Sequence, residues 1–193
     1  MLSFAVLARF DTWVPFAITG PALTGVALLT RVIPARLLAP SFATVSSGLG
    51  VGLVMLGLTH VAYAVVAPLV PGARAGTASL VALVNVGGFS PMARAGLVVV
   101  IATCEEVIFR GPLPLNTRAS GPSRWGLVAQ ATAFSAVYAA ACFPLGSLLL
   151  LLVAFLCGLA WSALRIASRS LAAPIIAHVV WDLGVLVVWP LPV

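Results

Sequence analysis

Residues 104–111 read CEEVIFRG, and this stretch places two adjacent glutamates at the end of an apolar run that begins at Ala95. The whole chain contains only four acidic residues: Asp11, Glu105, Glu106 and Asp182. Placing one carboxylate at the centre of a bilayer costs roughly 2.5–3.5 kcal/mol on insertion scales. We therefore expect that the doubled glutamate serves chemistry rather than packing.

The spacing within this stretch puts the two glutamates on different faces of a helix. Each residue turns the helix by roughly 100°, so Glu106 and Arg110 are i,i+4 neighbours that can form an ion pair. Glu105 lies about 140° from Arg110 by the same arithmetic, and we predict that it points elsewhere, free for chemistry. The simpler alternative is an ordinary ion pair at a helix end that reaches the interface; the doubled glutamate argues against it.

The composition is typical of a helical membrane protein. Of 193 residues, 62% are hydrophobic and 7% are charged, whereas about 25% of residues are charged in a soluble domain. The net charge of +6 comes from arginines scattered in short loops, as membrane orientation requires, with no cluster dense enough for nucleic acid. We predict an all-α fold, a polytopic membrane helical bundle, in an integral membrane protein of the bacterial plasma membrane.

About six transmembrane helices are predicted, because a spanning helix needs about 20 apolar residues. The apolar runs that meet this length cover 13–30, 41–70, 95–113, 125–143, 145–164 and 171–188. Turn signals between Pro71 and Pro91 predict a break. The apolar piece 78–86 inside it is too short to span, so it is either an interfacial helix or a re-entrant segment. Gly48 and Gly52, one turn apart, predict the close approach of another helix.

Positive charge orients this bundle. With six spans, one side carries six arginines: Arg31, Arg36, Arg118, Arg124, Arg165 and Arg169. The other side carries three: Arg9, Arg74 and Arg94. The positive-inside rule places the richer side in the cytoplasm. We therefore predict that both termini are extracytoplasmic and that the glutamate pair lies in the cytoplasmic half.

A second ionisable pair lies in the last apolar segment. His178 and Asp182 are i,i+4 neighbours, so both face the same way, and an ionisable pair within a membrane helix is a functional hypothesis by default. A His–Asp hydrogen bond that only stabilises packing is the alternative. Because the other buried acids are the glutamate pair, we expect the two sites to meet, with Glu105 facing a polar cavity that it shares with Tyr138, His178 and Asp182. The remaining histidine, His60, is interpreted as a polar residue bonded to a neighbouring helix rather than as a ligand.

These motifs together resemble those of the CPBP intramembrane proteases, the family of the CAAX prenyl proteases and the bacterial Abi-type proteins. The resemblance rests on Glu-Glu-x-x-x-Arg at 105–110 and on His-x-x-x-Asn/Asp at 178–182, which follows the similar phrase SLAAPIIA at 170–177. It covers about half of the chain. We expect a single membrane-embedded domain over 1–193 with a CPBP-like motif core at 95–188.

The middle motif departs from the family's pattern. Where the family has Phe-x-x-x-His, residues 134–138 read FSAVY, so Tyr138 stands in place of the histidine. Cys142, one turn further on, shares the face of Tyr138 but does not restore the motif.

The resemblance implies a role for each motif residue. The family's first glutamate activates a water, so Glu105 would be the general base, while Glu106 and Arg110 would hold the helix end. The family's late histidine and asparagine face the substrate carbonyl, which places His178 and Asp182 there. A carboxyl group donates to an oxyanion only when it is protonated. At the position of the missing histidine, the Tyr138 hydroxyl could still hydrogen-bond a water.

A metal role for these residues is also proposed in the family. A zinc site usually takes three protein ligands, and the candidates here are Glu105, His178 and Asp182. A phenol stays protonated at neutral pH, so Tyr138 is a poor replacement for imidazole. We therefore expect no cofactor, and zinc binding that is weak or absent.

Two functions remain open. The first is CAAX-protease-like peptide-bond hydrolysis within the membrane with impaired chemistry, since loss of one positioned acid–base group costs roughly 10²–10⁴-fold in rate. The second is a catalytically inactive family member, an accessory or scaffold subunit of a larger membrane protein complex. The expected partners are membrane lipids and another integral membrane protein, and not nucleic acid. The substitution at Tyr138 favours the second function, and the other motif residues favour the first.

Overall fold

The computed structural model describes residues 13–84, 89–112 and 124–192. Within these ranges the chain is all-helical, with seven α-helices, two short 3₁₀ turns, a terminal π-helical turn and no strand. In chain order the elements are α2 (Trp13–Leu29), η1 (Ala35–Leu38), α3 (Phe42–Leu69), α4 (Ala73–Val84), α5 (Pro91–Arg110), α6 (Arg124–Ala141), η2 (Phe143–Leu145), α7 (Leu148–Ser168), α8 (Ala172–Leu183) and η3 (Gly184–Val188). The predicted all-α class is confirmed.

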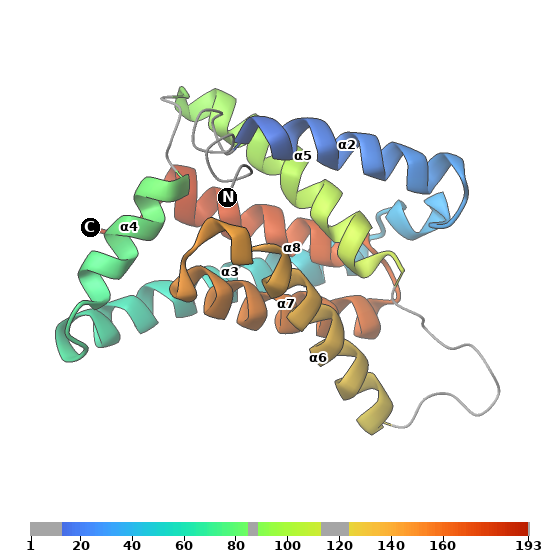
Figure 1. Ribbon diagram of the computed structural model, residues 1–193. Coiled ribbons are helices and arrows are strands. Elements are labelled where there is room, and N and C mark those ends of the chain that lie inside the picture. The colour runs from blue at the N-terminus through green and yellow to red at the C-terminus, as the bar shows by residue number, and fades with distance from the viewer. Residues whose placement is uncertain (1–12, 85–88, 113–123, 193) are drawn as a thin grey trace.

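The long helices alternate in direction through the bundle. α2, α5 and α7 run one way, α3, α6 and α8 run the other way, and α4 lies beside the C-terminal end of α3 (Figure 1). Three of the described helical stretches are long and apolar enough to cross a membrane: Phe42–Leu69, Trp125–Leu145 and Leu148–Ser168. Two more apolar stretches, Phe16–Leu29 and Ala172–Val188, are shorter.

α8 lies at the centre of the packing, in contact with α3, α5 and α7. Its closest neighbour is α3, because two glycines bring the helix backbones together. A Cβ atom added at Gly48 would lie 2.7 Å from the carbonyl oxygen of Ala173, and one added at Gly52 would lie 2.8 Å from that of Ala177. The predicted close approach at these glycines is confirmed, and α8 is its partner.

Local capping explains where α3 and α5 begin. The Ser41 hydroxyl accepts a hydrogen bond from the backbone N–H of Thr44, whose own side chain accepts from the backbone N–H of Ser41, which forms a capping box. α5 begins at Pro91 rather than at the predicted 95, because the Ser90 side chain caps it and proline fits the first turn of a helix. α5 ends at Arg110, earlier than the predicted 113, because residues 111 and 112 form a turn.

α7 begins at Leu148, three residues later than predicted. Residues 143–145 form a 3₁₀ turn, and Gly146 then adopts a left-handed conformation with φ 73°. Glycine takes this conformation without the steric cost of a Cβ atom. The Ser147 side chain caps the helix that follows.

The break predicted between Pro71 and Pro91 contains a longer helix than the apolar piece 78–86. α4 has 12 residues, Ala73–Val84, and residues 85 and 86 lie outside the described part. The helix starts early because Gly72, with φ 82°, turns the chain directly after α3. At 1.5 Å per residue α4 is roughly 18 Å long, too short for a hydrocarbon core of about 30 Å. It packs against α3 and α7.

His60 fastens the end of the chain to α3. Its Nδ1 lies 3.0 Å from the carbonyl oxygen of Leu56 and its Nε2 lies 2.9 Å from that of Trp189. The imidazole also stacks on the Trp189 ring, with centroids 4.1 Å apart. One turn further along α3, the Tyr63 hydroxyl donates to the carbonyl oxygen of Pro192. His60 is a hydrogen-bonded polar residue as predicted, but its partner outside α3 is Trp189, which follows η3, rather than a residue within a neighbouring helix.

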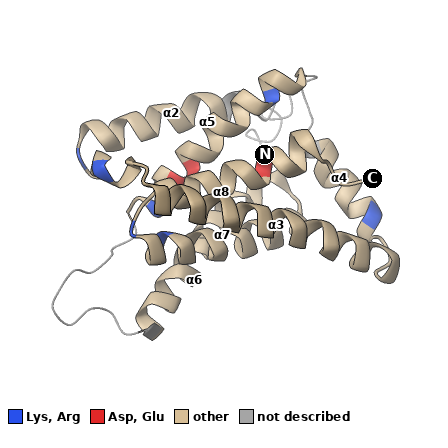
Figure 2. Cartoon of the chain, turned by 180° about the vertical axis from the view of Figure 1, so that it is seen from behind, with Lys and Arg blue, Asp and Glu red and all other residues tan. Residues whose placement is uncertain are grey.

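The arginines of the described chain lie at the two ends of the bundle (Figure 2). At the end where α2, α5 and α7 finish and α6 begins (Figure 1) lie Arg31, Arg36, Arg110, Arg124, Arg165 and Arg169. At the opposite end lie Arg74, near the start of α4, and Arg94, near the start of α5. This grouping matches the predicted sidedness for the residues described. Which end faces the cytoplasm stays a prediction, and Arg9 and Arg118 lie outside the described part.

Candidate functional site

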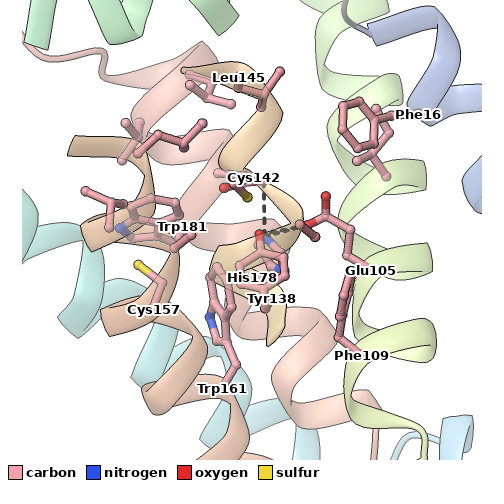
Figure 3. Close-up of a pocket in the computed structure, with 18 of the residues that line it drawn as sticks. Phe16, Glu105, Phe109, Tyr138, Cys142, Leu145, Cys157, Trp161, His178 and Trp181 are labelled. Atoms are coloured by element: carbon pink, nitrogen blue, oxygen red, sulfur yellow. Dashed lines mark hydrogen bonds and ion pairs between the residues drawn. The ribbon is translucent and has the colours of Figure 1, made fainter. Parts of the chain in front are cut away.

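The residues of the predicted site line a cavity inside the helical bundle. Its volume is about 350 Å³, and Glu105, Tyr138, His178 and Asp182 are all part of its wall. Figure 3 shows how Glu105 of α5 reaches across it toward Tyr138 of α6 and His178 of α8. The prediction of a polar cavity is wrong. α2, α4, α5, α6 and α7 contribute mostly aliphatic, aromatic and thiol side chains to the wall, so the polar groups form one patch in an apolar cavity.

α5 separates the two adjacent glutamates, as the helical spacing predicts. The Glu105 side chain is 22% exposed and lines the cavity, whereas the Glu106 side chain is 0% exposed. Glu106 Oε1 lies 3.1 Å from Arg110 Nη1, one turn along the same helix. The predicted Glu106–Arg110 pair is confirmed, and it leaves Glu105 facing the open space.

Tyr138 occupies the side of Glu105 on which the family places a histidine. Its hydroxyl donates a hydrogen bond to Glu105 Oε2 at 2.9 Å. His178 is on another helix, α8, far along the chain. Its Nε2 lies 3.8 Å from the same Oε2 atom and 3.4 Å from Asp182 Oδ2. The predicted meeting of the glutamate motif with the His178–Asp182 motif is therefore found, with His178 between the two carboxylates.

A second contact joins the two motifs more tightly, and the sequence did not reveal it. His178 Nδ1 lies 2.9 Å from Glu106 Oε1, and both side chains are buried. A carboxylate only accepts hydrogen bonds, so Nδ1 carries a proton and donates it. This fixes the rotation of the imidazole and turns Nε2 toward Glu105 and Asp182. Glu106 thus does more than hold the helix end with Arg110: it also positions His178.

Trp161 of α7 is a further member of the site that sequence reasoning missed. Its ring stacks on His178 with centroids 3.6 Å apart and an interplanar angle of 19°, and it meets Tyr138 edge-on. It is 1% exposed. A tryptophan in an apolar run carries no sequence signal that separates a site residue from a core residue. The stack covers one face of His178, so the ring is held by this contact as well as by the hydrogen bond at Nδ1.

The charge of Arg110 is offset by an ion pair with Glu106 and by two aromatic rings rather than by hydrogen bonds. Its three guanidinium nitrogens make no hydrogen bond of regular geometry among the described residues, and the Nη1–Glu106 contact is an ion pair. The guanidinium carbon lies 4.4 Å from the centre of the Tyr138 ring and 5.4 Å from that of Trp161. A cation over aromatic faces gains electrostatic stabilisation that grows when water is absent.

Comparison with protein families agrees with this geometry. Residues 87–184 match the family model described as type II CAAX prenyl endopeptidase Rce1-like. The chain belongs to this Rce1-like family. The matched range contains all six predicted site residues, from Glu105 to Asp182. Among curated proteins and among solved structures nothing matches. Family membership and the apolar helices make the chain a protease-like integral membrane protein.

A zinc ion does not fit the Rce1-like site formed by these residues. Among the described residues, no group of three His, Cys, Asp or Glu side chains is arranged to hold a metal ion. His178 offers one free nitrogen, because its Nδ1 is engaged by Glu106. The position beside Glu105 is taken by the Tyr138 hydroxyl. The expectation of weak or absent zinc binding stays a prediction.

The three cysteines of this Rce1-like chain also line the cavity. Cys104, Cys142 and Cys157 are free thiols on α5, on the residue after α6 and on α7. Cys142 does lie on the side of Tyr138, as the helical spacing predicts, but the hydrogen bond to Glu105 comes from Tyr138. The thiols therefore contribute small apolar surface to the cavity wall, which agrees with their position in apolar helices.

Proposed function

We propose that this Rce1-like protein hydrolyses peptide bonds within the membrane, slowly, with Glu105 as the general base. The observation that supports this best is the position of the Glu105 carboxylate. It is partly exposed, lines an apolar cavity, and lies 3.8 Å from an imidazole nitrogen whose orientation is fixed. An apolar cavity suits a substrate segment that comes from lipid, and a carboxylate that faces it can activate water there.

The proposed reaction needs only water, the peptide and this chain. Glu105 takes a proton from a water in the cavity, and the resulting hydroxide attacks the carbonyl carbon of the peptide bond. The C–N bond then breaks, and the proton held by Glu105 goes to the departing amine. In the proposed step His178 has a proton on each ring nitrogen: Nδ1–H donates to Glu106, and Nε2–H, on the side of Glu105 and Asp182, donates to the oxyanion. Fixed charge aimed at a developing oxyanion is a large catalytic effect.

Tyr138 makes this chemistry slow. The family pattern has a second base at this position, and a tyrosine hydroxyl does not accept a proton from water at neutral pH. Here the hydroxyl instead donates to Glu105 Oε2, so one of the two oxygens of the general base is already engaged. Asp182, in place of an asparagine, lies 3.4 Å from His178 Nε2 and competes with the oxyanion for the same N–H group.

The test is to restore the family's residue. Wild type, Tyr138→His, Glu105→Gln and the double variant are reconstituted in liposomes with a prenylated peptide that ends in a CAAX sequence, and products are measured by mass spectrometry. We expect slow cleavage by wild type, a rate about 10²-fold higher for Tyr138→His, and none for either Glu105→Gln protein. Cys142→Ala, which changes the cavity wall alone, is the matched control and should retain the wild-type rate.

Two outcomes would contradict the proposal. Cleavage that survives Glu105→Gln would exclude this residue as the base. A Tyr138→His protein that folds like wild type and cleaves no faster would show that the missing histidine is not what limits the rate.

The second candidate function is an accessory subunit without catalysis. One observation favours it: every described acid of the site already has a protein partner, Glu105 with Tyr138, Glu106 with Arg110 and Asp182 with His178. Such a network rigidifies the bundle without any reaction. The partner would be another integral membrane protein. In that case Glu105→Gln leaves cellular function intact, and purification in mild detergent recovers a second membrane protein with this chain.

A further inference from the structure

The C-terminal turns of α7 contain a buried arginine with no counter-charge among the residues that the structure describes. Arg165 is 2% exposed, and its Nε and Nη1 atoms have no hydrogen-bond partner in the described chain. Ser162, three residues earlier and therefore on the same face of the helix, is 0% exposed, and its hydroxyl also lacks a partner. Neither residue lines the cavity of the candidate site.

The three described acids of the chain are engaged elsewhere. Glu106 pairs with Arg110 and His178, Glu105 with Tyr138, and Asp182 with His178. The fourth acid, Asp11, lies outside the described residues. Two arginines are thus buried on this side of α5 and α7, and only one of them has a described carboxylate. An unpaired buried charge is strongly destabilising, so the charge of Arg165 calls for an anion from outside the described chain.

The chemistry of the unpartnered groups also points to an anion. On this stretch of α7, outside the cavity wall, they are Ser162 Oγ and, at the end of the helix, Nε and Nη1 of Arg165. A guanidinium group only donates hydrogen bonds. A donor-rich set of this kind suits a ligand that only accepts, and the planar guanidinium fork matches the oxygens of a phosphate.

The depth of Arg165 identifies the source of that phosphate. The apolar stretch of α7 ends at Ser168, so Arg165 lies roughly 4.5 Å inside the end of the helix at 1.5 Å per residue. This is the arginine-rich end of the bundle, where the exposed Arg36 and Arg169 also lie (Figure 2). Basic residues between helices near the membrane surface attract anionic headgroups.

We propose that Arg165 binds the phosphate of an anionic phospholipid at this end of α7. The lipid supplies the missing counter-charge. The site is separate from the Glu105 cavity, so the proposal does not depend on peptidase activity.

The test is the melting temperature of the full chain in a mild non-ionic detergent, followed by intrinsic tryptophan fluorescence. Phosphatidylglycerol is added as the probe, with phosphatidylcholine of the same acyl chains and inorganic phosphate as the other arms. For wild type we expect phosphatidylglycerol to raise the melting temperature by about 5 °C, and the other two additions to have little effect. Arg165→Met should lose this shift, and the exposed control Arg169→Met should keep most of it.

A second readout covers the case in which Arg165→Met behaves differently for structural reasons alone. Without lipid, Arg165→Met should be at least as stable as wild type, because removing an uncompensated buried charge relieves its cost. The proposal is overturned if phosphatidylglycerol stabilises Arg165→Met as much as wild type, or if phosphatidylcholine stabilises wild type equally. A full shift with inorganic phosphate overturns the lipid and assigns the site to a soluble anion.

Discussion

The two sides of α5 use the same residue type for different purposes. On the buried side, Glu106 is 0% exposed and contacts both Arg110 and His178. On the cavity side, the adjacent Glu105 is 22% exposed, and the Tyr138 hydroxyl is the hydrogen-bond donor described for it. The difference teaches that burial and the number of partners, not residue type, decide whether a membrane-embedded acid stabilises the fold or is available for a reaction.

The largest expected effect on stability comes from changing Glu106, on the buried side of α5. Glu106→Gln removes the charge that offsets Arg110 and weakens the hydrogen bond that orients His178, because a neutral amide oxygen replaces the carboxylate. Breaking a buried ion pair by removing one partner costs about 3–5 kcal/mol, which lowers the melting temperature by roughly 10 °C. The matched control is Glu105→Gln, one residue away, which should melt within about 2 °C of wild type because its group is partly exposed. Equal losses for both variants would remove the distinction between the two sides.

A smaller loss of stability is expected at the contact between α3 and α8, the helix that carries His178. A Cβ atom at Gly52 would lie 2.8 Å from both the Ala177 carbonyl oxygen and Val180 Cβ. Gly52→Val therefore displaces α8, which carries His178, and overpacking of this kind costs about 1–3 kcal/mol. The control is Gly50→Val, since nothing lies within 4 Å of a Cβ at Gly50, and it should leave the melting temperature unchanged. Thermal melts in detergent that show equal effects at the two glycines would argue against this α3–α8 contact.

The smallest effect is expected on the cavity side. Tyr138→Phe removes the hydroxyl that bonds Glu105 and keeps the ring contacts with Phe109 and Trp161. Loss of one hydrogen bond costs about 1 kcal/mol, a drop of roughly 3 °C in melting temperature. Tyr138→Ala also removes the buried ring, which costs about 3–5 kcal/mol. If the two variants melt alike, the hydroxyl rather than the ring carries the stability, contrary to this division.

Much of the fold could be predicted from the sequence, because spacing along one helix determines which residues share a face. The limits of α3 follow from the polar Ser41 and the length of the apolar run, and the Glu106–Arg110 pair and the close contact at Gly48 follow from helical periodicity. The bond between His178 Nδ1 and Glu106, and the stack of Trp161 on His178, depend on how separate helices are rotated against each other. No spacing within one helix contains that information.

The cavity and α4 were mispredicted for a related reason. The motif residues are polar, but a cavity takes its character from every helix around it, and five further helical elements contribute apolar side chains. The start of α4 was missed because residues 73–77 carry a weak apolar signal, while the turn at Gly72 permits a helix at once. The bacterial plasma membrane, the division into one domain and the absence of a cofactor stay predictions.

The central claim is that Glu105 performs chemistry while Glu106 holds the site together. The most direct measurement is the peptide-cleavage rate per folded molecule in the Tyr138→His background, compared between Glu105→Gln and the unchanged glutamate, with the melting temperature recorded for both. The account predicts that Glu105→Gln abolishes cleavage and leaves the melting temperature within about 2 °C. Cleavage that continues after Glu105→Gln, in a protein that melts normally, would contradict it.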